Sequence, residues 1–198
     1  MPLWGATDAD ESKPKFLTDE QKKTCFATSS GWVLENGALT GNDNPNADPE
    51  ILVAIGDLTT SLGSADITEI EFISTAFDQS AGGQIQVRVR FNEAVDVNVS
   101  GGTPSLAITN GNQGTGSGRG PHAAAYASGT GTNELVFSLA IAAANAATNA
   151  DDVLSIGAQN ILKPGGATIK DTAGTASDSA VAISGAKGTA AGTLTVVA

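Results

Sequence analysis

The chain divides near residue 60 by the way hydrophobic and polar residues follow one another. From residue 66 onward, short stretches alternate strictly between apolar and polar positions, as in QIQVRVRF at 84–91. Strict alternation puts successive side chains on opposite faces, so it predicts strands with one buried and one solvent-facing side. The pattern predicts strands at 68–74, 84–91, 94–100 and 133–141, with shorter ones at 105–109, 123–128, 152–156, 167–170, 181–184 and 193–197.

Turn-forming segments separate these strands. They are SGGTP, NGNQGTGSGRG, SGTGTN, KPGG and GAKG, in which glycine supplies positive φ without steric cost. Many short strands at this spacing predict a mainly β fold, with an antiparallel β-sandwich over residues 66–198. The alanine-rich stretch AAANAATNADD at 142–152 is predicted to hold a helical turn across one end of that sandwich.

Residues 1–60 show no sustained periodicity and are predicted to form an extended N-terminal arm or small subdomain. One helix start is legible, because Thr18 can cap the following amides and Gln21 stands at the third helical position. A short helix is therefore expected from about 19 to 26. The apolar segment ILVAIGDL at 51–58 fits either a buried strand or a short docking segment, and its flanks do not decide between them.

Composition supports the β prediction and bears on the class of partner. Hydrophobic residues make up 40% of the chain and glycine contributes 24 positions, which suits short strands and tight turns rather than a helical bundle. The net charge is −11 and no basic cluster occurs, which argues against nucleic acid as a partner. No run approaches the length of about 18 apolar residues that a membrane helix needs, so no membrane partner is expected.

The residues available for enzyme chemistry are few. Cys25 is the single cysteine and is predicted to be an apolar filler, since the single histidine, His122, lies about a hundred residues away. The stretch GNQGTGSGRGPH at 111–122 has the glycine spacing of a phosphate cradle but lacks the Gly-Lys-Ser/Thr ending of a P-loop. It is predicted to be an exposed loop between strands, in which Arg119 and His122 are candidates for recognition.

Carboxylates raise the question of a metal or of glycosidase chemistry. Asp151 and Asp152 are adjacent, and Asp171 and Asp178 follow in the same half. Calcium needs about six or seven converging oxygens, and adjacent aspartates in a strand point to opposite faces. A glycosidase would pair two carboxylates in a cleft with aromatic platforms, yet residues 66–198 hold no tryptophan and only Tyr126. We therefore expect no enzyme activity, no metal and no cofactor.

The large apolar side chains of the first sixty residues call for a packing partner. A buried tryptophan contributes roughly 4–6 kcal/mol by area before ordering costs, so each either folds back on this chain or contacts another protein. Because the arm lacks the pattern of its own core, contact with a partner is favoured. The predicted docking residues are Leu3, Trp4, Pro14, Phe16, Phe26 and Trp32.

The C-terminal part resembles the bacterial immunoglobulin-like repeats of large surface adhesins. The resemblance rests on VRVRFNEAVDVNVSGGTPSLAITNGN, AAAYASGTGTNELVFSLAI and ILKPGGATIKDTAGTASDSAV. It implies an immunoglobulin-like antiparallel β-sandwich. Where those repeats usually carry a Gly-Asp-rich segment this chain has AAANAATNA, so their calcium role does not carry over.

The N-terminal part is similar to the openings of virion structural proteins in tailed phages, particularly those of marine and cyanobacterial hosts. The matching elements are LWG at 3–5, residues 8–15, LT at 17–18, GWV at 31–33 and EILVAIG at 50–56. This similarity implies a non-enzymatic capsid decoration or cement protein on the outer surface of the capsid. It would dock through its first sixty residues and display the immunoglobulin-like domain.

The implied partners are the major capsid protein, other virion subunits and further copies of this chain, with weak glycan binding as an extension. Three alternatives stay open: a tail, neck or fibre component of the virion, a calcium-binding adhesin module of a cell surface, and a carbohydrate-active enzyme.

Overall fold

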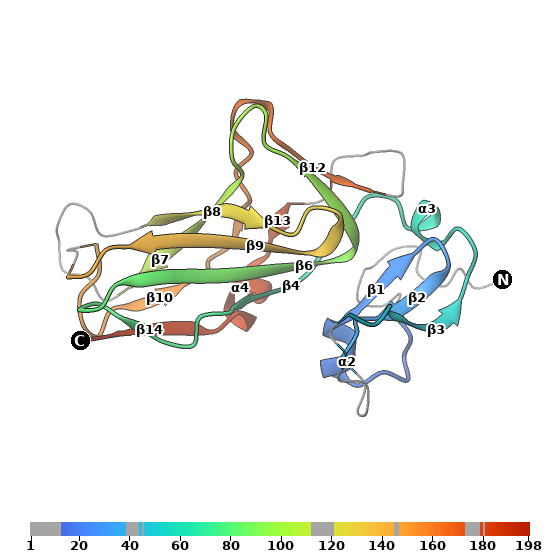
Figure 1. Cartoon of the computed structure of the whole chain (residues 1–198), viewed down its shortest axis with the longest axis horizontal. Coiled ribbons are helices and arrows are strands. Elements are labelled where there is room, and N and C mark those ends of the chain that lie inside the picture. Colours follow the sequence, from blue (N-terminus) through green and yellow to red (C-terminus); the bar gives the residue numbers. More distant parts are fainter. Residues whose placement is uncertain are drawn as a thin grey trace.

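The computed structural model describes residues 13–38, 44, 46–111, 121–144, 147–172, 179 and 181–198. These residues form an elongated, mainly β and sandwich-like molecule (Figure 1). A smaller group of elements, residues 13–62, lies at one end and is called the N-terminal unit below. The remaining elements, residues 65–198, make up the β-rich body.

The N-terminal unit is a three-stranded antiparallel meander with two short helices. Its elements are α2 (Asp19–Lys23), β1 (Cys25–Thr28), β2 (Gly31–Leu34), β3 (Glu50–Ala54) and α3 (Leu58–Leu62). It has a hydrophobic cluster of its own, in which Trp32 is fully buried. The buried members are Leu17, Cys25, Ala27, Trp32, Leu34 and Leu58. An extended arm thus stays a prediction only for residues 1–12, which lie outside the described residues.

The predicted helix start is confirmed, but the predicted helix end is wrong. The Thr18 side chain accepts from the Gln21 amide at 3.2 Å and the Gln21 side chain accepts from the Thr18 amide at 3.0 Å, which forms a capping box. The helix ends at Lys23 rather than near Phe26, because Cys25 begins a strand that pairs with β2 and buries alternate side chains. The segment at 51–58 forms a strand over residues 50–54, but this strand is not buried as that alternative expected, since Ile51 is 60% exposed.

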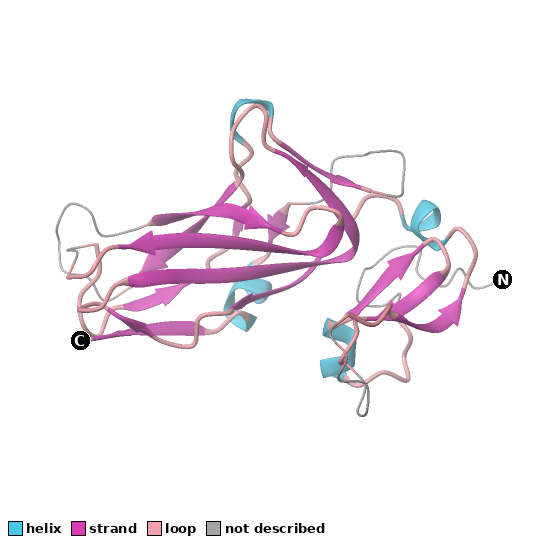
Figure 2. Ribbon diagram, in the orientation of Figure 1, coloured by secondary structure: helices cyan, strands magenta, loops and turns pink. Residues whose placement is uncertain are grey.

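The β-rich body contains most of the strands and one further helix. They are β4 (Ile67–Phe72), β5 (Phe77–Asp78), β6 (Gly83–Asn98), β7 (Ser105–Asn110), β8 (His122–Ser128), β9 (Thr132–Ile141), β10 (Val153–Ser155), β11 (Gln159–Asn160), the 3₁₀ turn η1 (Pro164–Gly166), β12 (Thr168–Asp171), β13 (Ala182–Ile183), α4 (Gly185–Ala190) and β14 (Thr193–Val197). Figure 2 shows how strands dominate this part. Its core is a second hydrophobic cluster, which runs from Ala65 to Val196 along the chain.

The described strands pair into one large mixed sheet and one small pair. The large sheet follows the order β3-β2-β1-β6-β9-β8-β7-β10-β14-β5, with β4 and β12 also paired to β6, and β11 pairs with β13. The prediction of an antiparallel sandwich over residues 66–198 is wrong at one place, where β14 runs parallel to β5. A second parallel pair, β1 with β6, joins the N-terminal unit to the body and was not predicted. Long stretches of chain separate the members of each pair, and such connections allow parallel pairing.

The central strand β6 joins two strands that were predicted separately. The predicted segments at 84–91 and 94–100 fall in one sixteen-residue strand, Gly83–Asn98. The alternation breaks in its middle, where the four residues from Arg90 to Glu93 are all buried. At this point the pairing with β9 shifts register, and β1 of the N-terminal unit comes alongside. The break therefore marks the place where the two parts of the molecule meet.

Other predictions in the body were met to different degrees. Strand β14 has the predicted bounds 193–197, and the remaining short strands lie at the predicted positions with shifted ends. The described residues of 142–152 form turns instead of a helical turn. Helix α4 was not predicted, although Ser184 caps it by accepting from the Lys187 amide. No helix within the described residues is long and apolar enough to cross a membrane.

Candidate functional site

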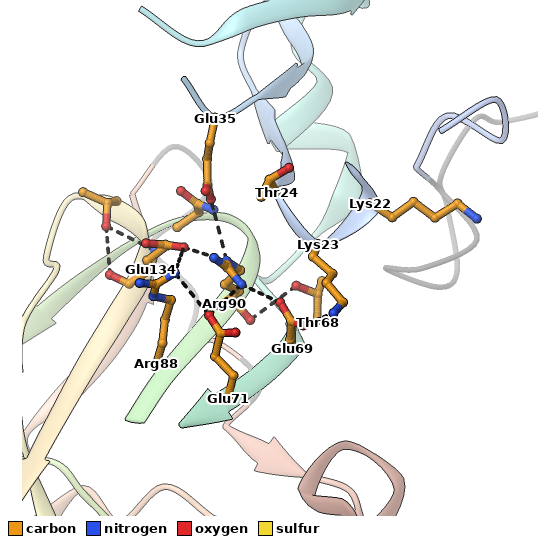
Figure 3. A network of polar contacts seen from close by, with 12 residues as sticks. Lys22, Lys23, Thr24, Glu35, Thr68, Glu69, Glu71, Arg88, Arg90 and Glu134 are labelled. Atoms are coloured by element: carbon orange, nitrogen blue, oxygen red, sulfur yellow. Dashed lines mark hydrogen bonds and ion pairs between the residues drawn. The ribbon is translucent and has the colours of Figure 1, made fainter. Parts of the chain in front are cut away.

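The junction between the N-terminal unit and the β-rich body carries the densest polar network of the described residues. Ala27 of β1 pairs with Glu93 of β6, so the sheet continues from one part into the other. The side-chain amide of Asn133 donates to the Glu35 carboxylate at 2.8 Å, and the Lys23 ammonium lies 3.3 Å from Glu69. Figure 3 shows Glu35 and Lys23 of the N-terminal unit beside Glu69 and Arg90 of the body.

Arg90 is the centre of this network. Its Nε donates to Glu134 at 2.6 Å, and its Nη1 donates to Glu69 at 2.6 Å and Glu71 at 3.0 Å. Arg88 lies 3.1 Å from Glu71 and 3.5 Å from Glu134. Burial of the Arg90 guanidinium disfavours its charge, but the surrounding carboxylates outweigh this effect and raise its pKa.

Cross-strand pairing brings these charges together. Glu69 of β4 and Glu134 of β9 are both register partners of Arg90, while Glu71 of β4 is the partner of Arg88. Alternation therefore places all five side chains on the same face of the sheet. The sequence predicted this polar face to be in water. Instead the N-terminal unit covers part of it, and the charged rows become the contact between the two parts.

Glu35 is the acidic group that the N-terminal unit contributes. Its carboxylate is 4.0 Å from the Nε of Arg90 and accepts from Asn133, whose residue is 5% exposed. Burial raises the pKa of Glu35, and the hydrogen bond from Asn133 partly opposes that rise. On the helix side, the hydrogen bond to Glu20 and the charge of Glu69 raise the pKa of Lys23.

Glu93 is a second acidic group at the junction, and its environment differs from that of Glu35. The residue is completely buried, and neither carboxylate oxygen has a hydrogen-bond partner among the described residues. Burial raises its pKa to about 8, with further contributions from the carboxylates of Asp171 and Asp66. At neutral pH this carboxyl is therefore mostly protonated.

Two hollows of about 350 Å³ each lie at the junction. The first, called the lysine hollow, has Lys13, Lys22, Lys23, Glu69, Ile70 and Lys187 in its lining. The second, called the Phe26 hollow, has Phe26, Glu35, Pro49, Thr132, Asn133 and Glu134 in its lining. Lys23 and Glu69 join the charged network to the first hollow, and Glu35 and Glu134 join it to the second.

The predicted docking residues fall into three groups. Phe16 is 69% exposed and Phe26 is half-buried in the wall of the Phe26 hollow. Pro14 is buried, and Trp32 is 0% exposed within the core of the N-terminal unit. Trp32 and Pro14 are thus buried by this chain itself, and the docking role of the six residues stays a prediction. Leu3 and Trp4 lie outside the described residues.

The remaining candidates give no catalytic arrangement among the described residues. His122 is half-buried at the start of β8, its Nε2 has no hydrogen-bond partner there, and Arg119 lies outside the described residues. Cys25 is buried as predicted, and burial raises its thiol pKa to about 11. The described residues contain no group of three or more His, Cys, Asp or Glu placed to hold a metal ion.

Sequence reasoning identified Glu69, Glu71, Arg88 and Arg90 only as a solvent-facing row, and it missed Glu35, Asn133 and Glu93 as junction residues. The sequence offered one local sign of this network. Two glutamates alternate with apolar residues on the predicted strand at 68–74, and two arginines do so on the predicted strand at 84–91. Comparisons with known proteins add no identification, since no protein-family model, no curated protein and no solved structure matches the chain.

Proposed function

We propose that the chain is a non-enzymatic structural protein of a phage particle, of the capsid decoration or cement type. In this proposal the N-terminal region docks on the shell, and the β-rich body is an immunoglobulin-like sandwich displayed on the outer surface of the capsid. The partners are the major capsid protein, neighbouring virion subunits or further copies of this chain.

The observation that carries the proposal is that the N-terminal unit has a core of its own and still exposes a large aromatic side chain. Leu17, Trp32 and Leu58 pack in a cluster separate from that of the body. Phe16, directly before Leu17, remains 69% exposed. An exposed aromatic anchor on a self-contained unit is what a docking module requires.

Two further features support a binding role over catalysis. The buried Cys25 thiol, with a pKa of about 11, is almost entirely protonated at neutral pH and so is a poor nucleophile. The described residues of the body also expose large apolar side chains, namely Val99 at 49%, Leu162 at 61% and Val197 at 47%. A tail, neck or fibre position uses the same docking unit, and the choice of particle fraction in the experiment separates these locations.

The test is cosedimentation of the purified full-length protein with particles from which it has been removed. Trp4→Ala and Phe16→Ala should each lower the pelleted fraction at least tenfold, because a buried aromatic anchor typically contributes 2 kcal/mol or more to a complex. Leu162→Ala is the control for Phe16→Ala, since it removes an apolar side chain of the body that is 61% exposed, against 69% for Phe16. Wild-type protein that fails to pellet with capsid or tail fractions would refute the proposal.

A further inference from the structure

The lysine hollow concentrates positive charge in an acidic protein. Four of the chain's seven lysines line it: Lys13, Lys22 and Lys23 from the N-terminal unit and Lys187 from α4 of the body. With the carboxylates of Asp19 and Glu69, the charged residues of the lining sum to +2, whereas the whole chain carries −11. Such a reversal of sign creates a local field that attracts anions.

The carboxylates of the lining pair with Lys22 and Lys23 but not with Lys187. Lys23 is held by Glu20 at 3.2 Å and Glu69 at 3.3 Å, so its charge belongs to the junction network. Lys22 pairs at 3.3 Å with Asp19, whose side chain is fully exposed, and such surface pairs are weak. Lys187 forms no ion pair with any described residue.

The lysines of the hollow come from both parts of the molecule, the N-terminal unit and helix α4 of the body. The Lys13 ammonium donates to the backbone carbonyl of Lys22 at 2.5 Å, and residue 13 is only 2% exposed. Lys22 extends from α2 away from the Arg90 network, as Figure 3 shows. Lys187 comes from the first turn of α4, which Ser184 caps, and Ile70 of β4 provides an apolar wall. The hollow thus combines three lysines that have partners within the chain, a fourth, Lys187, without an ion pair among the described residues, and a partly apolar lining.

We propose that the lysine hollow binds a multivalent oxyanion of the phosphate class, held between Lys187 of the body on one side and Lys22 of the N-terminal unit on the other. A lysine ammonium offers three rotatable N–H donors, and a dianion can accept from several of them at once. Because the ligands come from both parts of the molecule, the bound anion ties the N-terminal unit to the β-rich body. The binding does not depend on the proposed function.

The experiment titrates inorganic phosphate into the full-length protein at pH 7.5 and measures binding by calorimetry and by the rise in Tm. Ionic strength is held constant with sodium chloride, so that general screening is not mistaken for binding. Methyl phosphate serves as a second probe, because one of its oxygens is esterified. Equal binding of both probes identifies a site open to phosphate groups on larger molecules, and preference for inorganic phosphate identifies a site for the free ion.

Lys187→Gln and Lys22→Gln should each weaken phosphate binding about tenfold, as expected for one charged hydrogen bond. Lys15→Gln is the matched control, since Lys15 is exposed on the N-terminal unit but does not line the hollow. The Tm of each variant without phosphate reports whether it is folded. Phosphate that binds no better than chloride, or that binds Lys187→Gln as tightly as wild type, would overturn the proposal.

Discussion

Glu93 offers the sharpest test of how the junction is built. Its carboxyl is completely buried beside the carboxylates of Asp171 and Asp66, and its oxygens have no hydrogen-bond partner among the described residues. Glutamine has nearly the same shape as a protonated glutamate but cannot ionise. The substitution Glu93→Gln therefore removes the titration while keeping the packing.

The magnitude follows from the pKa of about 8, compared with the ordinary value of 4.5. Because the folded state holds this proton more tightly than the unfolded chain, Glu93 contributes stability that is fully present below pH 4.5 and is lost as pH rises to about 8. At 1.36 kcal/mol per pKa unit, the loss between pH 5.5 and pH 9 comes to roughly 3 kcal/mol.

The assay is urea unfolding of wild type and Glu93→Gln at half-unit steps from pH 5.5 to 9. The free energy of unfolding of wild type should fall relative to that of the variant by about 3 kcal/mol across this range. Leu162→Ala, at an exposed position without a titrating group, is the control and should run parallel to wild type. If the Glu93→Gln curve also runs parallel to wild type, the carboxyl does not titrate in a buried site and the reasoning fails.

Three further substitutions test the packing and the network. Trp32→Ala should lower the free energy of unfolding by about 3–5 kcal/mol, whereas the exposed Phe16→Ala should change it by less than about 1 kcal/mol; similar losses would contradict the two burials. Arg90→Met should cost about 2–3 kcal/mol, because the half-buried carboxylates of Glu69 and Glu134 lose their shortest ion pairs; adding Glu134→Gln should recover part of that loss, which a double-mutant cycle measures. Gly165→Ala should lower Tm by several degrees, because φ is +60° there and a Cβ would collide with the carbonyl oxygen of Gly101; an unchanged Tm would show that this loop can move.

Local rules account for what the sequence predicted well. Alternation predicted the strand around Ile85, Val87 and Val89 correctly, because a strand buries every second side chain and these three are fully buried. The Thr18 and Gln21 spacing fixed the helix start, since both halves of the capping box lie within one turn. Both features depend on residues close together in the sequence.

The junction depended on contacts that no local pattern encodes. The polar row of Glu69 and Arg90 looks the same whether water or another part of the chain covers it. Likewise, Trp32 gave no sign of whether it packs on this chain or on another protein, because its packing residues Leu17 and Leu58 are scattered along an aperiodic segment. The parallel approach of β1 to β6 requires a pairing between residues 27 and 93, which nothing in either segment announces.

The pairing of Ala27 with Glu93 also bears on the order of unfolding, because it lies at the junction between the two parts. Each part is closed around its own apolar cluster, whereas the junction relies on one strand register pair, ion pairs and a side-chain hydrogen bond. Contacts of this kind open at lower free energy than a packed core, so the junction should open reversibly while the N-terminal unit and the body both stay folded. Under a pulling force the chain would first extend at the junction, and the junction would close again when the force is released.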